Sequence, residues 1–134
     1  MLQKNDTFSY NFSISQDDVI KFAQLSGDTN PIHLDKEYAK KTIFKRTIIH
    51  GYLGSAVFSK VLGTMFPGEG TIYLSQNLKF HQPMHTDDIY IAEFLVTEII
   101  PEKHRAIVVT TIRLSTDMSL ITSGEALIQN ELFI

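Results

Sequence analysis

The N-terminal part of the chain changes from one hydrophobic period to another. Between residues 7 and 14 every second residue is apolar, which predicts a half-buried β-strand. Between residues 16 and 26 apolar residues recur three and four positions apart, which predicts an amphipathic helix. Ser15, followed by Asp18 three positions later, fits a capping box at its start. Gly27 allows backbone angles that end a helix, so we expect the helix to stop there.

Residues 51–66 form the most apolar helical segment of the chain. The segment carries one charged residue, Lys60, and no acidic residue. Pro67 and Gly68 follow directly and end it. A helix that is apolar on nearly all sides is expected to be surrounded by protein.

The rest of the chain alternates in the manner of strands separated by turn residues. The four expected strand regions are residues 72–80, 89–96, 106–114 and 120–132. In the second region the apolar phase changes from Ile89 and Ile91 to Phe94, which predicts a bulge near Ala92. Consecutive strands with short connections imply an antiparallel meander. One buried helix followed by such a sheet is an α+β arrangement, here a single domain over residues 1–134.

The amino-acid composition excludes several classes of protein. The chain has 134 residues, of which 43% are hydrophobic, enough for one core. A formal charge of −3 gives no indication of binding to nucleic acid or to an anionic membrane surface. The absence of cysteine excludes disulfides, thiolate metal sites and a cysteine nucleophile. No signal sequence or membrane-length apolar run is visible, so we expect a soluble, cytoplasmic protein.

One turn brings an acid and an imidazole close together in sequence. Asp28 and His33 are five residues apart, and Pro31 pushes the preceding Asn30 toward extended backbone. We therefore expect the chain to bend sharply and to deliver both side chains to one small volume. His50 and Gly51 follow seventeen and eighteen residues after His33, and Gly51 begins the apolar helix.

This combination resembles a known family of enzymes. The first stretch reads Phe22-Ala23-Gln24-Leu25-Ser26-Gly27-Asp28-Thr29-Asn30-Pro31-Ile32-His33, and the second is His50-Gly51. The two stretches are similar to the motif of the MaoC-like hydratases, the (R)-specific enoyl-CoA hydratases, and no core position of the motif departs from it. In layout the resemblance covers nearly the whole chain. It implies a hot-dog fold, in which an antiparallel sheet wraps a long central helix, and dimers paired edge to edge with the site often at the subunit boundary.

The resemblance also implies roles for individual residues. Asp28 and His33 correspond to the catalytic acid–base pair, and the backbone amide of Gly51 to the donor that stabilises the thioester oxyanion. Ser59 corresponds to an active-site serine of the central helix, and Asn30 to a residue that orients the turn or the carboxylate. The implied reaction hydrates a trans-2-enoyl thioester of coenzyme A or acyl carrier protein to the (R)-3-hydroxyacyl product, without metal or redox cofactor. Which member of the pair takes the first proton stays open.

Each residue alone has an ordinary structural explanation. Asp28 suits a turn, His33 a hydrogen-bonded structural histidine, Gly51 a helix start and Ser59 close helix packing. Only the combination and its spacing favour catalysis. Two enzyme alternatives remain: a 3-hydroxyacyl-ACP or hydroxyacyl-CoA dehydratase, which would use the same residues, and a thioesterase, which the acid-free helix argues against. A non-catalytic acyl-binding domain is the third alternative, and the intact acid–imidazole pair argues against it.

The remaining polar residues carry weaker signals. His81 and His85 have helical ligand spacing, but Pro83 between them breaks the helix that would align them, so we predict no metal site. His50 is interpreted as a brace for the helix start rather than a reacting group. Four basic residues could meet the phosphates of coenzyme A or simply face solvent: Lys45, Arg46, Lys60 and Lys79.

Overall fold

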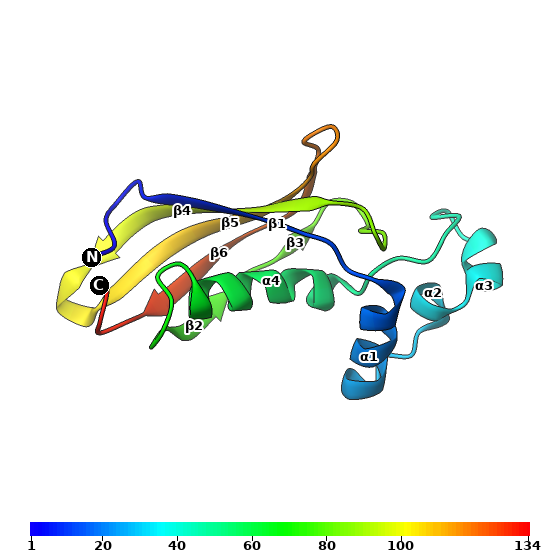
Figure 1. Cartoon of the computed structure of the whole chain (residues 1–134), viewed down its shortest axis with the longest axis horizontal. Helices are drawn as coiled ribbons and strands as arrows, with labels where there is room; N and C mark the ends of the chain where they lie inside the picture. The colour runs from blue at the N-terminus through cyan, green and yellow to red at the C-terminus, as the bar shows by residue number, and fades with distance from the viewer.

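The computed structural model describes residues 1–134 and consists of one antiparallel sheet packed on one long helix. Helix α4 runs along the sheet, and the three short helices α1–α3 gather beyond its N-terminal end (Figure 1). The helices are α1 (Gln16–Ser26), α2 (Pro31–Leu34), α3 (Lys36–Lys40), α4 (Gly51–Thr64) and a 3-10 turn (Pro101–Lys103). The strands are β1 (Thr7–Phe12), β2 (Ile72–Gln76), β3 (Lys79–Phe80), β4 (Tyr90–Ile100), β5 (Arg105–Leu114) and β6 (Leu120–Gln129). The predicted α+β arrangement is confirmed.

The sheet is a meander only in part. Strands β4, β5 and β6 are consecutive antiparallel neighbours, as predicted, but the full order is β1-β4-β5-β6-β2, with β3 also paired to β6. Strands β1 and β2, which flank helices α1–α4 in the chain, lie at opposite edges of the sheet. The region predicted as one strand over residues 72–80 is two strands, both on β6. Gly124 of β6 permits the break, since a Cβ atom there would collide with the carbonyl oxygen of Asn77.

The predicted bulge near Ala92 is wrong. Pairing of β4 with β5 is continuous from Tyr90 to Val96, and the register shifts only between Val96 and Glu98. Tyr90 faces the core instead of Ile89 because its hydroxyl accepts a hydrogen bond from the His85 amide at 2.8 Å. A tyrosine can be buried at little cost when its hydroxyl has such a partner. Tyr90, Ala92, Phe94 and Val96 therefore form one inward-facing row without a bulge.

Helix α4 buries one face and exposes the other. Its inner residues pack in the main hydrophobic cluster with the sheet; they are Val57, Phe58, Val61 and Leu62. Tyr52, Ala56 and Ser59, spaced four and three apart, lie exposed on the outer side. The prediction of a helix enclosed on all sides is therefore wrong for a single chain. The helix ends at Thr64, two residues before the predicted limit. No helix combines the length and apolar character needed to cross a membrane.

The start and end of α1 follow the prediction. Ser15 and Asp18 form a reciprocal capping box, with the Asp18 amide donating to Ser15 Oγ at 3.1 Å and the Ser15 amide to Asp18 Oδ2 at 3.0 Å. Gly27 has φ of +80°, the left-handed conformation that glycine adopts without strain. Helix α1 therefore ends at Ser26, and only the C-cap Gly27 separates it from Asp28.

Candidate active site

The turn after α1 fixes the backbone of Asp28. The amide of Gly27 closes the helix by donating to the carbonyl of Ala23 at 2.9 Å. The Oγ atom of Ser26 then accepts a hydrogen bond from the Asp28 amide at 3.1 Å and donates to the carbonyl of Phe22 at 2.7 Å. Asp28 thus projects from a turn that is tied to the last turn of α1.

Asn30 contacts both sides of the turn. Its amide donates to Asp28 Oδ1 at 3.3 Å, and its side-chain Oδ1 accepts from the Ile32 amide at 3.2 Å. Asn30 is the N-cap residue of α2, and Pro31 occupies the first helical position, where it needs no backbone acceptor. Asn30 therefore touches the carboxylate and starts the short helix that carries His33.

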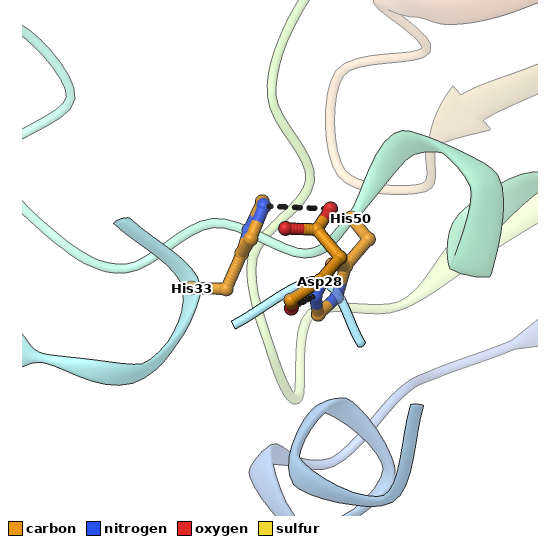
Figure 2. Close-up of side chains that lie close together, drawn as sticks. All are labelled: Asp28, His33 and His50. Carbon is orange, nitrogen blue, oxygen red and sulfur yellow. Dashed lines mark hydrogen bonds and ion pairs between the residues drawn. The ribbon is translucent and has the colours of Figure 1, made fainter. Parts of the chain in front are cut away.

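The hydrogen bonds of His33 define its tautomer. Nδ1 lies 2.8 Å from the carbonyl oxygen of Ile48. A carbonyl only accepts, so Nδ1 carries the proton of the neutral ring and the lone pair is on Nε2. Nε2 lies 3.9 Å from Asp28 Oδ2 (Figure 2). The imidazole is 10% exposed and the carboxylate 51% exposed, so the pair combines a buried base with a carboxylate open to solvent.

The separation of the pair suits joint contact with a third group. At 3.9 Å, Nε2 and Oδ2 are too far apart for a direct hydrogen bond. Both atoms remain free to contact one oxygen placed between them, as acid–base work on a single water molecule requires. The predicted proximity of Asp28 and His33 is confirmed.

Gly51 places a free amide close to His33. It is the first residue of α4, and its N–H donates to no acceptor in the protein. A cleft of about 360 Å³ is lined by both His33 and Gly51, with Phe80, Met84 and Thr122 among its other walls. Asp28 is not among its lining residues. The N-terminus of a helix favours negative charge, so this amide is suited to bind an anionic oxygen.

Ser59 lies away from this cleft. It is two turns inside α4 on the exposed face and does not line the space shared by His33 and Gly51. The serine nearest the start of α4 is Ser55, whose hydroxyl donates to the carbonyl of Gly51 at 2.8 Å. A larger groove of about 580 Å³ lies between β1, α1 and α4, but none of the predicted site residues lines it.

His50 joins the site in a way that the sequence did not predict. Its Nε2 lies 3.0 Å from the main-chain oxygen of Asp28, and its ring stacks on that of His33 with centroids 3.8 Å apart. As the N-cap of α4 it makes no side-chain capping bond, but its bond to Asp28 joins the helix start to the turn, in line with its predicted role as a brace. Its position directly before Gly51 was the only signal in the sequence.

The side chains of Asp28, His33 and His50 bring possible metal-ligand atoms within 4.8 Å of one another, as a metal site requires. His50 Nε2, however, carries the hydrogen that it donates to Asp28, and the two rings are inclined by only 27°. Stacked rings direct their lone pairs side by side and not toward one point. The arrangement fits an acid–base pair better than a metal centre. His81 and His85 do not converge either, because His81 bonds Ser123 Oγ and His85 bonds the carbonyl of Thr47.

These features define a class: a hot-dog protein with a paired acid and imidazole beyond the N-terminus of the central helix. Residues 2–118 match the family described as "MaoC like domain", and the chain belongs to this family. The expected membership and fold are confirmed.

Similar proteins support the same class. The chain is 41% identical over 116 residues to a 3-hydroxybutyryl-CoA dehydratase of Methylorubrum extorquens, covering 87% of this chain and 73% of that protein. It is 41% identical over 112 residues to an (R)-specific enoyl-CoA hydratase of Aeromonas caviae, covering 84% and 83%. The solved structure of the (R)-hydratase from A. caviae involved in PHA biosynthesis superimposes with a TM-score of 0.92 at 36% identity, covering 96% and 97%. Hydratases and dehydratases are both hydro-lyases, which places this chain among the hydro-lyases.

Proposed function

We propose that this chain is an (R)-specific enoyl-CoA hydratase, which adds water reversibly to trans-2-enoyl-CoA and gives (R)-3-hydroxyacyl-CoA. One observation carries the proposal: the Asp28–His33 pair is separated by 3.9 Å, and His33 shares a cleft with the free amide of Gly51. The names of the similar hydratases support the substrate and the stereochemistry.

In the proposed reaction Asp28 and His33 hold one water molecule beside the alkene. The water oxygen bonds to C3 as the pair removes one of its protons, and the pair delivers one proton to C2. The pair gains and loses one proton, so its protonation state is restored. Each acid–base contribution is worth roughly 10²–10⁴ in rate. The lone pair on His33 Nε2 supports His33 as the acceptor of the first proton.

Negative charge collects on the thioester oxygen when water attacks C3. The Gly51 amide, aimed by α4, donates a hydrogen bond to this oxygen, and the helix dipole favours the charge. Loss of one such donor typically costs about 10²–10³ in rate. Addition of water causes no net oxidation or reduction of the substrate, so the reaction needs no redox cofactor, and the residues described supply its acid, base and oxyanion donor.

The reverse reaction is a second candidate for the physiological role. A 3-hydroxybutyryl-CoA dehydratase is among the similar proteins, and the same residues would remove water from a hydroxyacyl thioester. Thioester hydrolysis is disfavoured because α4 offers no carboxylate to direct water at the carbonyl carbon. Function in the cytoplasm stays a prediction.

We further propose that the working form is a homodimer. Strand β2 is an open edge of the sheet and exposes Ile72 and Leu74. Leu74 lines a shallow groove together with Tyr52 of the outer face of α4. An unpaired apolar edge of this kind is suited to pair with the same edge of a second copy. Ser59 lies on the same outer face, so in such a dimer it would approach the partner chain, and its catalytic role depends on that assembly.

Crotonyl-CoA tests the proposal. Purified protein should consume it with loss of enoyl-thioester absorbance and yield the (R)-3-hydroxy product on chiral analysis. Release of free coenzyme A thiol without change at C2 and C3 would instead identify a thioesterase, and binding without turnover an acyl-binding domain. Rates with matched CoA and acyl-carrier-protein thioesters then decide the carrier.

A further inference from the structure

His50 is the N-cap residue of α4, but its side chain contacts a different segment. His50 is 2% exposed, and its side chain makes no capping bond to the helix. Its Nε2–H donates instead to the main-chain oxygen of Asp28, 22 positions earlier in the chain, at 3.0 Å. His50 therefore ties the N-terminus of α4, where Gly51 lies, to the turn that carries the carboxylate.

The same ring holds the face of the second member of the pair. It stacks on His33 with centroids 3.8 Å apart and an interplanar angle of 27° (Figure 2). The ring of Phe22 in α1 packs edge to face on the His50 ring, with the two ring centroids 4.8 Å apart. His33 is thus located by two contacts, the Nδ1 bond to Ile48 at its edge and the His50 ring at its face.

The choice of histidine is unfavourable for the helix start alone. Serine, threonine, aspartate and asparagine are the side chains that cap helices, and His50 makes no such bond. Its Nδ1 is buried without a hydrogen-bond partner, which costs stability. Such a cost is expected where a residue serves a site.

We propose that His50 is a positioning residue that sets the separation of Asp28 and His33 and their placement relative to Gly51. This inference rests on the proposed function, because it assigns His50 a role in that reaction. His50 touches no reacting atom: it does not line the cleft, and its Nδ1 is enclosed. It acts through the main chain of one partner and the ring face of the other.

Two substitutions separate the two contacts. His50→Gln retains an N–H near the position of Nε2 and removes the aromatic face. His50→Phe retains the face and removes the donor, and His50→Ala removes both. Because a misplacement of about 1 Å can cost roughly 10²-fold in rate, we expect His50→Ala to lower kcat by about that factor, and each of the other two by about tenfold. The KM for crotonyl-CoA should stay within about twofold, since binding energy from the cleft is untouched.

A matched control removes buried ring packing elsewhere on α4. Phe58 is 1% exposed, and its ring packs on that of Phe94 with centroids 5.8 Å apart. Its ring makes no aromatic contact with His33 or His50. Phe58→Leu should lower the free energy of unfolding and leave kcat per folded molecule unchanged. If the His50 variants behave like Phe58→Leu, or keep kcat within about twofold of wild type, the positioning role is wrong.

Crystal structures of wild type and His50→Phe test the inference without activity. The inference predicts that the distance from Asp28 Oδ2 to His33 Nε2, or the position of the Asp28 carbonyl, changes by on the order of 1 Å in the variant. An unchanged pair would overturn the inference even if wild-type protein hydrates crotonyl-CoA. A displaced pair in a protein without hydratase activity would support the positioning role and refute the proposed function.

Discussion

The ring of Phe80 lies against the Cα atom of Gly51, so that a Cβ atom at residue 51 would be 2.7 Å from Cε1 of Phe80. Gly51→Ala must therefore displace either the ring or the start of α4. We expect kcat for crotonyl-CoA hydration to fall by about 10²–10³, because the oxyanion donor moves. Steady-state kinetics of the variant would measure this.

Gly63 supplies the control for this substitution. It lies in the same helix, and a Cβ atom there would meet nothing within 4 Å. Gly63→Ala should keep full activity and gain up to about 1 kcal/mol of stability from helix propensity. Adding Phe80→Ala to Gly51→Ala should recover part of the lost rate. Normal turnover in Gly51→Ala would contradict the role of this amide.

Asn30→Ala should reduce both stability and turnover. The substitution removes the acceptor for the Ile32 amide, a cap worth about 1 kcal/mol, and loosens the helix that carries His33. Asp35→Ala is the matched control, because it removes the equivalent cap of α3, where the Tyr38 amide donates to Asp35 Oδ1 at 3.0 Å. Thermal unfolding should show similar losses in both variants, and kcat should fall only in Asn30→Ala. Equal kcat values would show that the Asn30 cap has no part in the reaction.

His85 makes stability depend on pH. Burial lowers the pKa of His85 from its ordinary value of 6.5, against a smaller opposing effect of its bond to the Thr47 carbonyl. The unfolded chain therefore binds the proton first as pH falls, and the free energy of unfolding should decrease below pH 6.5. His85→Asn keeps a donor for Thr47 and cannot titrate. Urea unfolding from pH 7.5 to 5 should show a steeper loss in wild type than in His85→Asn, and parallel curves would contradict the assignment.

Leu74→Lys tests the proposed dimer. Leu74 is 40% exposed on the edge strand β2, and a charge there would be buried on edge pairing. Light scattering after gel filtration should show a dimer for wild type and a monomer for the variant. Leu95, 39% exposed on the inner strand β4, provides the control, and Leu95→Lys should remain dimeric. A monomeric wild type, or a dimeric Leu74→Lys, would argue against pairing through β2.

Local chemistry was predictable from the sequence, while distant contacts were not. The end of α1 at Gly27, the turn at Asn30-Pro31 and the start of α4 at Gly51 depend on neighbouring residues only, and all three are where the sequence placed them. The convergence of Asp28 and His33 follows from the same turn.

The pairing of β2 with β6 joins segments about fifty residues apart, and no local pattern encodes it. The inward-facing Tyr90 depends in the same way on the distant fit of its hydroxyl to the His85 amide. The contact of His50 with Asp28 spans 22 residues and became visible only in three dimensions.

Initial rates of crotonyl-CoA hydration by Asp28→Asn and His33→Gln test the central claim most directly. Each variant should lose at least about 10² in kcat while keeping the fold and assembly of wild type, and the double variant should be little worse than the worse single one, because the pair acts as a unit. Near-normal turnover in either folded variant would show that the acid–base pair is elsewhere.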